Sequence, residues 1–350
     1  MKQRNQTIDI LRLAAAFAVV CLHGFSNSGI AGGEEIVALA RFAVPLFFMI
    51  SGYFAVSFTP ARYGRQIVKI FLVAAAAIAF YVGGQLLRIS NPFEAGMQLR
   101  QWFSPESWKN LLLFNQTMAS EHLWFLLALE YCLILDLLLG RFLRKKAVVG
   151  ALAVCLFSVG LAVYHWGLGR QAAGEAFQLF WYRNFLFVGM PFYLGGRLIR
   201  LFGEDLPCPP VPLLVGLIPA LLVGSFLEFR WLGVREIYMS SVFLALVLLR
   251  LALARPLADG GRVVRGLAWL GRKCSLTVYV LHIMVMNLLQ DRYYSQVFYG
   301  QYPSGHTAVY YLVPPGAFLL TLGVSVLLAL AGVGLRRLFR KRRGAPKAAE

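Results

Sequence analysis

An arginine and a histidine lie within one apolar stretch near the start of the chain, DILRLAAAFAVVCLHG at residues 9–24. Arg12 and His23 are eleven residues apart, which at ~100° per residue leaves an offset of only ~20° on an α-helix. The two side chains would therefore share one helix face, separated by ~16 Å along the axis. An imidazole is the usual general base near neutral pH, and a guanidinium can stabilise an oxyanion. Asp9, one turn before Arg12, is expected to pair with it.

Each of these residues also has a structural interpretation. The Arg12 side chain, taken alone, is explained equally well by a guanidinium that extends to the lipid headgroups. The His23 imidazole could simply hydrogen-bond a neighbouring helix. This interpretation is weaker for His23, because an imidazole is costly to bury in a membrane. We therefore assign His23 and Arg12 as candidate catalytic residues.

A second group of cations lies in ARYGRQIVK, residues 61–69. Arg62, Arg65 and Lys69 follow one another at i, i+3 and i+7, which places them on one helical face. Three cations on one face can bind phosphate groups, either bidentately or as point charges. Ordinary positive-inside anchoring would explain this stretch if it stood alone. We predict that these three residues bind the phosphates of a cofactor.

Ionisable side chains inside apolar segments are costly and each suggests a function. In RFAVPLFFMISGYF, residues 41–54, Arg41 is near the outer end and is expected to face protein or water rather than lipid. Pro45 and Gly52 in the same stretch predict a distorted helix with close packing. Arg41 is therefore a candidate substrate-binding residue.

Four more candidates for substrate binding lie in two other apolar stretches. In EHLWFLLALEY, His122 is at the outer boundary and Glu130 lies ~12 Å deeper, where it must be neutralised, paired or solvated. His122 and Trp124 offer hydrogen bonding and stacking to an acceptor that enters from outside. His282, in GRKCSLTVYVLHIMV, is buried in the outer half of its segment. A structural hydrogen bond and a contact with substrate explain His282 equally well.

The composition sets the class of protein to which these residues belong. Of the 350 residues 59% are hydrophobic and only 16 are acidic, which is too little polar surface for a soluble domain of this length. The net charge of +18 would suit a nucleic-acid partner. However, the basic residues lie between apolar segments rather than in one patch, which favours a membrane protein and excludes nucleic acid. No spacing of cysteine and histidine suggests a metal site.

A membrane-spanning helix needs about 20 mostly apolar residues. The chain has ten such stretches, so we predict an all-α integral membrane protein with about ten transmembrane helices. The stretches are residues 10–27, 36–57, 66–87, 122–140, 147–166, 179–201, 211–228, 236–254, 267–289 and 309–335.

The distribution of lysine and arginine predicts the orientation in the membrane. Most of the 34 basic residues fall in the even-numbered connections and near the two ends, so both termini are expected in the cytoplasm. Residues 1–335 then form one membrane domain and 336–350 a basic cytoplasmic tail. The long outer connection, residues 88–121, contains SPESWKNLLLFN, which predicts a short capped amphipathic helix lying at the interface.

Five of these stretches, in this order, resemble the acyltransferase-3 family of bacterial inner-membrane proteins. They are the Arg-x10-His pair of the first span, VPLFFMISGY, the Arg-x-x-Arg pair, HLWFL and SLTVYVLH. The resemblance implies an acyl-CoA donor, most often acetyl-CoA, and a hydroxyl acceptor in the cell envelope. It also implies that His23, Arg12, Arg62 and Arg65 are essential. Some relatives carry a fused hydrolase-like or racemase domain, and we expect neither here.

The sequence thus predicts a membrane-bound O-acyltransferase of the bacterial cytoplasmic membrane. It would move an acetyl or succinyl group from cytoplasmic acyl-CoA to an envelope glycan or a related hydroxyl acceptor. His23 would act as general base, with a transient acyl-histidine as a second route, and Arg12 would orient the donor or stabilise the oxyanion. The alternative is a transporter or flippase for a small molecule or lipid-linked sugar. A homo-oligomer is compatible with either function.

Overall fold

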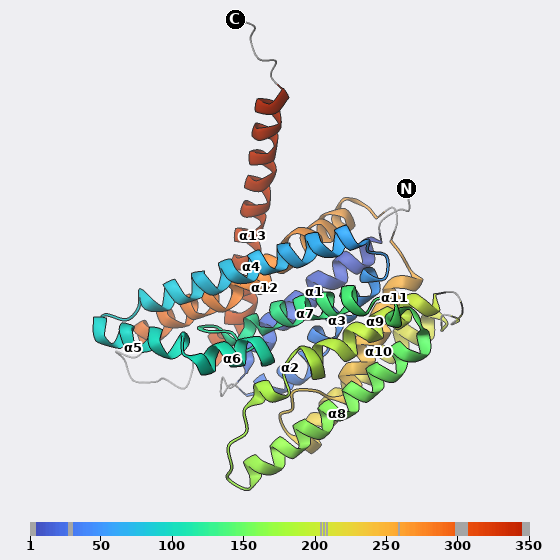
Figure 1. Ribbon diagram of the computed structural model, residues 1–350, viewed down its shortest axis with the longest axis horizontal. Coiled ribbons are helices and arrows are strands. Elements are labelled where there is room, and N and C mark those ends of the chain that lie inside the picture. Colours follow the sequence, from blue (N-terminus) through green and yellow to red (C-terminus); the bar gives the residue numbers. More distant parts are fainter. Residues whose placement is uncertain are drawn as a thin grey trace, which may run out of the picture. The chain divides into compact units, whose positions relative to one another are not determined.

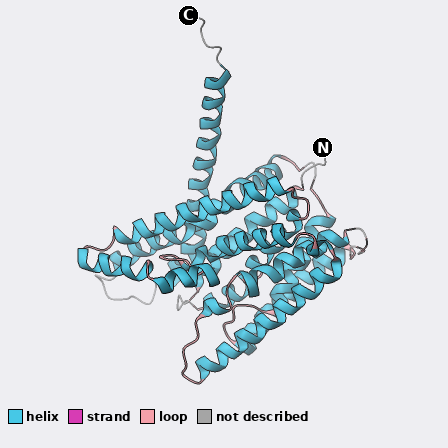
Figure 2. Cartoon of the chain, viewed as in Figure 1, coloured by secondary structure: helices cyan, strands magenta, loops and turns pink. Residues whose placement is uncertain are grey.

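The computed structural model describes residues 5–26, 31–203, 205, 207, 209–257, 260–297 and 307–344. In the last two helices the described side chains are those of residues 262–289 and 311–333. Every regular element in this part of the chain is a helix, which confirms the predicted all-α class (Figure 2).

Among the residues that the structure describes, eight helical stretches are long and apolar enough to cross a bilayer. Each coincides with one of the predicted spans. Of the other two predicted spans, residues 236–254 contain the helix Met239–Ala254. It has 16 residues, fewer than the ~20 that a span needs. Residues 267–289 lie inside a longer helix of 36 residues. The chain is therefore a multi-pass membrane protein, while the count of ten and the position of both termini stay predictions.

The chain divides into two compact units. Their helices are labelled in Figure 1. The first, Met1–Val44 with Pro209–Glu350, is built around its N-terminal helix, which packs against four others of the same unit. Its helices are α1 (Gln6–Phe25), α2 (Gly33–Ala40), α10 (Val211–Leu232), α11 (Met239–Ala254), α12 (Arg262–Val297) and α13 (Thr307–Gly344).

Helices α1 and α12 run in the same direction. Near the start of α1, a Cβ on Gly271 of α12 would lie only 1.8 Å from the carbonyl oxygen of Asp9. Near its end, His23 lies beside His282, which is further along α12. The absence of a side chain at Gly271 allows the two backbones to approach closely, as is common between membrane helices.

Helices α1 and α13 run in opposite directions. Phe17 of α1 contacts Phe318 of α13, with ring centroids 5.0 Å apart. Further along α1, Gly24 packs against Pro314, which precedes Phe318. A Cβ on Gly24 would lie 2.6 Å from the Pro314 ring, so this contact also depends on the missing side chain.

The second unit, Pro45–Cys208, contains the middle of the chain. Within it α4 packs against α7, and α8 packs against α9. Its elements are α3 (Ala43–Ala55), α4 (Pro60–Leu86), α5 (Pro92–Trp102), α6 (Pro105–Phe114), η1 (Glu121–Leu123), α7 (Trp124–Leu139), η2 (Phe142–Arg144), α8 (Lys146–Ala172), η3 (Leu179–Trp181), η4 (Phe185–Gly189) and α9 (Met190–Phe202).

The predicted helix at residues 36–57 is interrupted after Ala40 and starts again at Ala43. Proline has no N–H to donate to the carbonyl four residues earlier, and its ring collides with that carbonyl. For Pro45 this carbonyl belongs to Arg41, where the interruption lies. The predicted close packing is confirmed at Gly52, since a Cβ there would lie 1.8 Å from the Tyr193 carbonyl oxygen of α9.

The connection at residues 88–121 contains the capped helix that the sequence predicts. The Ser104 hydroxyl accepts a hydrogen bond from the Ser107 backbone N–H at the start of α6, and Asn115 ends the helix in a left-handed conformation. Its position at the membrane interface stays a prediction. At the other end of the chain, α13 continues through Gly344, so residues 336–344 of the predicted tail are helical. Residues 345–350 lie outside the described residues.

Candidate functional site

Arg12 and Asp9 form the ion pair that their spacing predicts. Arg12 Nη1 lies 3.3 Å from Asp9 Oδ1. The carboxylate is buried, whereas a quarter of the Arg12 side chain is exposed. The guanidinium therefore stays accessible at one end of α1 while its own helix supplies a counter-charge.

His23 of α1 lies against His282 of α12. The centroids of the two imidazole rings are 5.2 Å apart and the ring planes are inclined by 46°. His282 is completely buried, whereas His23 is only partly buried. The structure thus places His23, the predicted base, in contact with His282. The sequence predicts that His282 either binds substrate or makes a structural hydrogen bond.

The backbone of α12 determines the tautomer of His282. Its Nδ1 lies 2.7 Å from the Tyr279 carbonyl oxygen and 3.2 Å from that of Val278. Carbonyl oxygens only accept hydrogen bonds, so Nδ1 carries the proton, and in a neutral ring Nε2 is then the acceptor. The structural hydrogen bond that is one explanation for His282 is therefore present. It leaves Nε2 as the hydrogen-bond acceptor of the neutral ring.

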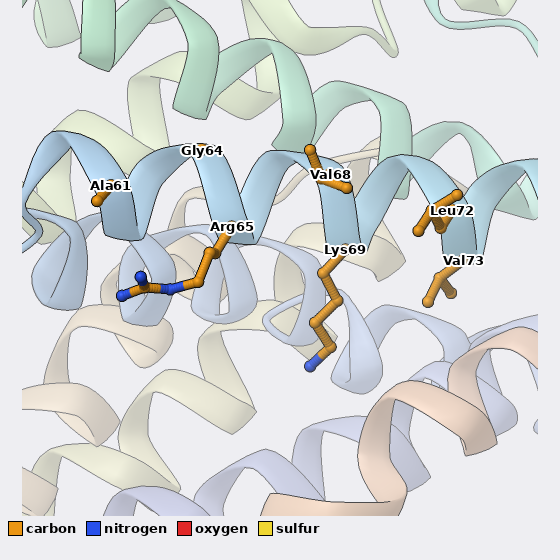
Figure 3. A pocket seen from close by; sticks show the side chains of 7 residues that line it. All are labelled: Ala61, Gly64, Arg65, Val68, Lys69, Leu72 and Val73. Atoms are coloured by element: carbon orange, nitrogen blue, oxygen red, sulfur yellow. The ribbon is translucent and has the colours of Figure 1, made fainter.

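Two of the three predicted phosphate-binding cations line a cavity of about 630 Å³ beside α4. Arg65 and Lys69 project from the same side of the helix (Figure 3). The other lining residues carry no charge. Ala61 and Gly64 precede Arg65, Val68 lies between the two cations, and Leu72 and Val73 follow Lys69 along the helix. The two cations are therefore followed by an apolar end of the cavity.

Arg62, the third predicted cation, does not line this cavity. Its guanidinium carbon lies 4.3 Å from the centroid of the Phe58 ring, a cation–π arrangement. The side chain is exposed, and its backbone N–H is part of the N-terminal cap of α4 formed by Thr59. The structure thus brings Arg65 and Lys69 together and gives Arg62 a different setting.

His122 and Trp124 are both buried in the second unit. His122 Nδ1 lies 2.6 Å from the hydroxyl oxygen of Ser120, and its ring meets the ring of Tyr81 nearly edge-on. Trp124 packs against Phe48, with ring centroids 6.2 Å apart. Ser120 is not among the residues predicted from the sequence, although a hydroxyl two residues before a histidine is a recognisable partner.

Arg41 and Glu130 have different surroundings. Arg41 Nη2 lies 3.3 Å from Glu236 Oε1 and only 9% of the residue is exposed, so it faces protein as predicted. Glu130 is also buried, so the requirement that its carboxyl group be neutralised, paired or solvated applies to the folded protein.

The second unit also contains a buried polar cluster that is not among the features predicted from the sequence. The Asp136 carboxylate accepts hydrogen bonds from the Tyr63 hydroxyl at 2.7 Å, the Tyr193 hydroxyl at 2.6 Å and Arg197 Nη1 at 2.5 Å. Asp136 and Arg197 both fall inside predicted spans, so the cost of burying a charge could have identified them.

Comparison with known proteins identifies the family. The acyltransferase-3 family, described as an acyltransferase domain, matches residues 5–333. An amino-acid racemase of Enterococcus faecalis is 32% identical over 183 residues, which cover 49% of this chain and 24% of that protein. No solved structure matches the chain. The chain spans only about a quarter of the length of this relative. Because the family match extends over nearly the whole chain, the protein belongs to the acyltransferase-3 family.

Proposed function

We propose that this protein moves an acetyl or succinyl group from cytoplasmic acyl-CoA to a hydroxyl of a cell-envelope glycan, in the cytoplasmic membrane of a bacterium. The observation that carries the proposal is the contact between His23 and His282. In a membrane acyltransferase, a partly buried imidazole beside a second imidazole of defined tautomer is suited to accept a proton from an acceptor hydroxyl.

His23 acts as the general base in the proposed reaction. Its unprotonated nitrogen takes the proton from the acceptor hydroxyl as that oxygen attacks the thioester carbonyl carbon. The tetrahedral oxyanion then collapses, the C–S bond breaks, and the imidazolium returns its proton to the departing thiolate. The products are the acyl ester and free CoA, so the imidazole is regenerated without a further reactant.

Two residues assist this step. His282, whose Nε2 is an acceptor, is suited to receive a hydrogen bond from the protonated nitrogen of His23, which leaves the other nitrogen of His23 as the base. Arg12 orients the donor, because ~16 Å along the axis of α1 separates it from His23 and places it too far from the reacting carbonyl to contact the oxyanion. Its pairing with Asp9 supports this role because it reduces the cost of keeping an accessible guanidinium in the membrane domain.

Donor binding is assigned to α4. Acyl-CoA is a polyanion with a long thin pantetheine arm, and the cavity beside α4 offers cations followed by apolar side chains. Arg65 and Lys69 would bind the phosphates, while Leu72 and Val73 would contact the arm. Arg62, exposed near the start of the same helix, adds positive charge for the approach of the donor.

The directions of the helices in the first unit support the proposed topology. With ten spans, α1 and α12 are the first and ninth and cross in the same direction, whereas α13 is the tenth and returns. The parallel packing of α1 with α12 and the antiparallel packing of α1 with α13 agree with this arrangement. Under it Arg12 is near the cytoplasm and His23 near the outer side.

The acceptor is proposed to enter from the outer side. His122, held by Ser120, would hydrogen-bond an acceptor hydroxyl. The other candidates for acceptor contacts remain Trp124, Glu130 and Arg41. His282 is not among them in this proposal, because Nδ1 donates to the Tyr279 carbonyl oxygen and Nε2 is assigned to His23. Proton removal by His23 and attack on the thioester are the same whether the hydroxyl belongs to a sugar or to another acceptor.

The test is acyl transfer by the purified protein in lipid nanodiscs, with labelled acetyl-CoA and a mixture of envelope glycans as acceptors. We expect a labelled ester whose mass exceeds that of the acceptor by one acyl group. Counterflow in liposomes without acyl-CoA is the companion experiment. Movement of a substrate there, with no acylation in the first experiment, would assign the protein to the carriers instead.

A further inference from the structure

The cluster around Asp136 joins three helices of the second unit through one oxygen atom. Asp136 Oδ2 of α7 accepts hydrogen bonds from Tyr63 of α4 and from Tyr193 and Arg197 of α9. Arg197 Nη2 also donates to the Leu143 carbonyl oxygen at 2.8 Å. The relative rotation of these helices is therefore specified by polar contacts as well as by apolar packing.

Stability alone does not explain such a cluster. Asp136 is 1% exposed and Arg197 is 3% exposed, and in the described part of the chain Asp136 Oδ1 and Arg197 Nε have no hydrogen-bond partner. A buried ion pair is often no more stabilising than apolar side chains of the same volume. What a buried polar network can provide is one defined arrangement of the elements that it joins.

Tyr63 connects this cluster to the donor-binding face of α4. Tyr63 and Arg65 are two residues apart, or ~200° around the helix, so they project from nearly opposite faces. Tyr63 points into the unit and is buried, whereas Arg65 and Lys69 line the cavity (Figure 3). Any rotation of this part of α4 that moves Tyr63 away from Asp136 also redirects both cations.

We propose that Tyr63 is a positioning residue for donor binding, because its hydrogen bond to Asp136 fixes the rotation of α4 that presents Arg65 and Lys69 to the phosphates of acyl-CoA. This inference rests on the proposed function of the α4 cavity. The Tyr63 hydroxyl also lies 2.9 Å from the Ala55 carbonyl oxygen at the end of α3. Its single proton is donated to one acceptor at a time, and both Asp136 and Ala55 are reached from this one orientation of α4.

The chain offers a matched pair of variants for the test. Tyr63→Phe and Tyr193→Phe each remove one hydroxyl that donates to the same Asp136 oxygen, but only Tyr63 belongs to α4. The dissociation constant of CoA is measured by calorimetry for each full-length variant in nanodiscs, together with thermal unfolding. If only about a fifth of the Tyr63→Phe molecules keep the binding orientation, the dissociation constant rises about fivefold. Tyr193→Phe should bind CoA as the unmodified protein does.

A purely structural role would give a different result. It predicts that the two variants lose thermal stability and CoA affinity to the same extent, and this outcome overturns the inference. Failure of the proposed function is recognised separately, because the unmodified protein would then not bind CoA and Arg65→Ala would change nothing. The same pair is compared in acyl transfer, where we expect Tyr63→Phe to raise KM for acetyl-CoA while kcat stays within about twofold.

Discussion

The imidazole rings of His23 and His282 lie 5.2 Å apart, centroid to centroid, on two helices that run in the same direction. His282 donates its Nδ1 proton to the main chain of its own helix, which makes Nε2 the acceptor of a neutral ring. The proposed base is therefore accompanied by a second imidazole that can select its tautomer. This relationship gives each histidine a distinct and separately testable role.

Replacing His23 by alanine should abolish most of the acyl transfer. We expect turnover to fall by about 10²–10⁴-fold, the usual contribution of a general base. CoA affinity should not change, because the cations of α4 are untouched. Labelled acetyl-CoA measures the first quantity and calorimetry the second. His165→Ala is the control, since that histidine is exposed and bonds only within α8; full turnover of the His23 variant would disprove the assignment.

Substitution of His282 by asparagine or by glutamine distinguishes the roles of its two ring nitrogens. Asparagine places its amide near the position of Nδ1, whereas glutamine reaches the position of Nε2. If Nε2 of His282 accepts from His23, His282→Gln should retain more kcat than His282→Asn at a similar KM for the donor. Steady-state kinetics of the two variants decide this. Equal losses of kcat in both variants would show that His282 acts only through its structural hydrogen bond to Tyr279.

Removing either cation of the α4 cavity should weaken donor binding. We expect Arg65→Ala and Lys69→Ala each to raise the dissociation constant of CoA about tenfold, which corresponds to ~1.4 kcal/mol. Arg62→Ala should have a smaller effect because its guanidinium rests on Phe58. Added salt should weaken CoA binding to the unmodified protein and have less effect on the variants. Unchanged affinity in both cavity variants would remove the donor site from α4.

The close contact of α1 with α12 should not tolerate a side chain at Gly271. A Cβ there would meet the Asp9 carbonyl oxygen at 1.8 Å, so the helices must separate. We expect Gly271→Ala to lower the free energy of unfolding by ~1–3 kcal/mol and to lower turnover, because Arg12 and His23 both lie on α1. Gly266 of α12 has open space around its Cβ position, so Gly266→Ala should stabilise the helix by ~0.5–1 kcal/mol. Thermal unfolding of both variants measures the difference.

Removing one partner of the buried Asp136–Arg197 ion pair should strongly lower the stability of the second unit. Asp136→Asn leaves the Arg197 charge buried without a carboxylate, which we expect to cost ~3–5 kcal/mol. The control is Glu175→Gln, which removes the partner of Arg170 in an exposed pair and should cost ~0–1 kcal/mol. Thermal unfolding of both variants in lipid nanodiscs measures these two losses of stability. Similar melting temperatures for the two variants would contradict the expected cost of leaving the Arg197 charge buried without its carboxylate.

The features that the sequence determined are those that arise within one helix or one turn. The helix period places Arg12 and His23 on a common face and Asp9 within reach of Arg12, and the structure contains that ion pair. The chemistry of proline accounts for the interruption before Pro45, and the serine cap accounts for the start of α6. These outcomes depend on backbone geometry and on neighbours a few residues away, so they can be derived before any packing is known.

The tertiary structure decided which distant residues become partners. Nothing in the pattern around His23 selects His282, and nothing in the apolar segment around Asp136 selects Tyr63 or Arg197. Those choices depend on how helices approach and rotate against one another, which is governed by side-chain packing and by glycines such as Gly271 at the closest contacts. A helical period specifies the face on which a residue lies, but only the packed fold specifies what that face meets.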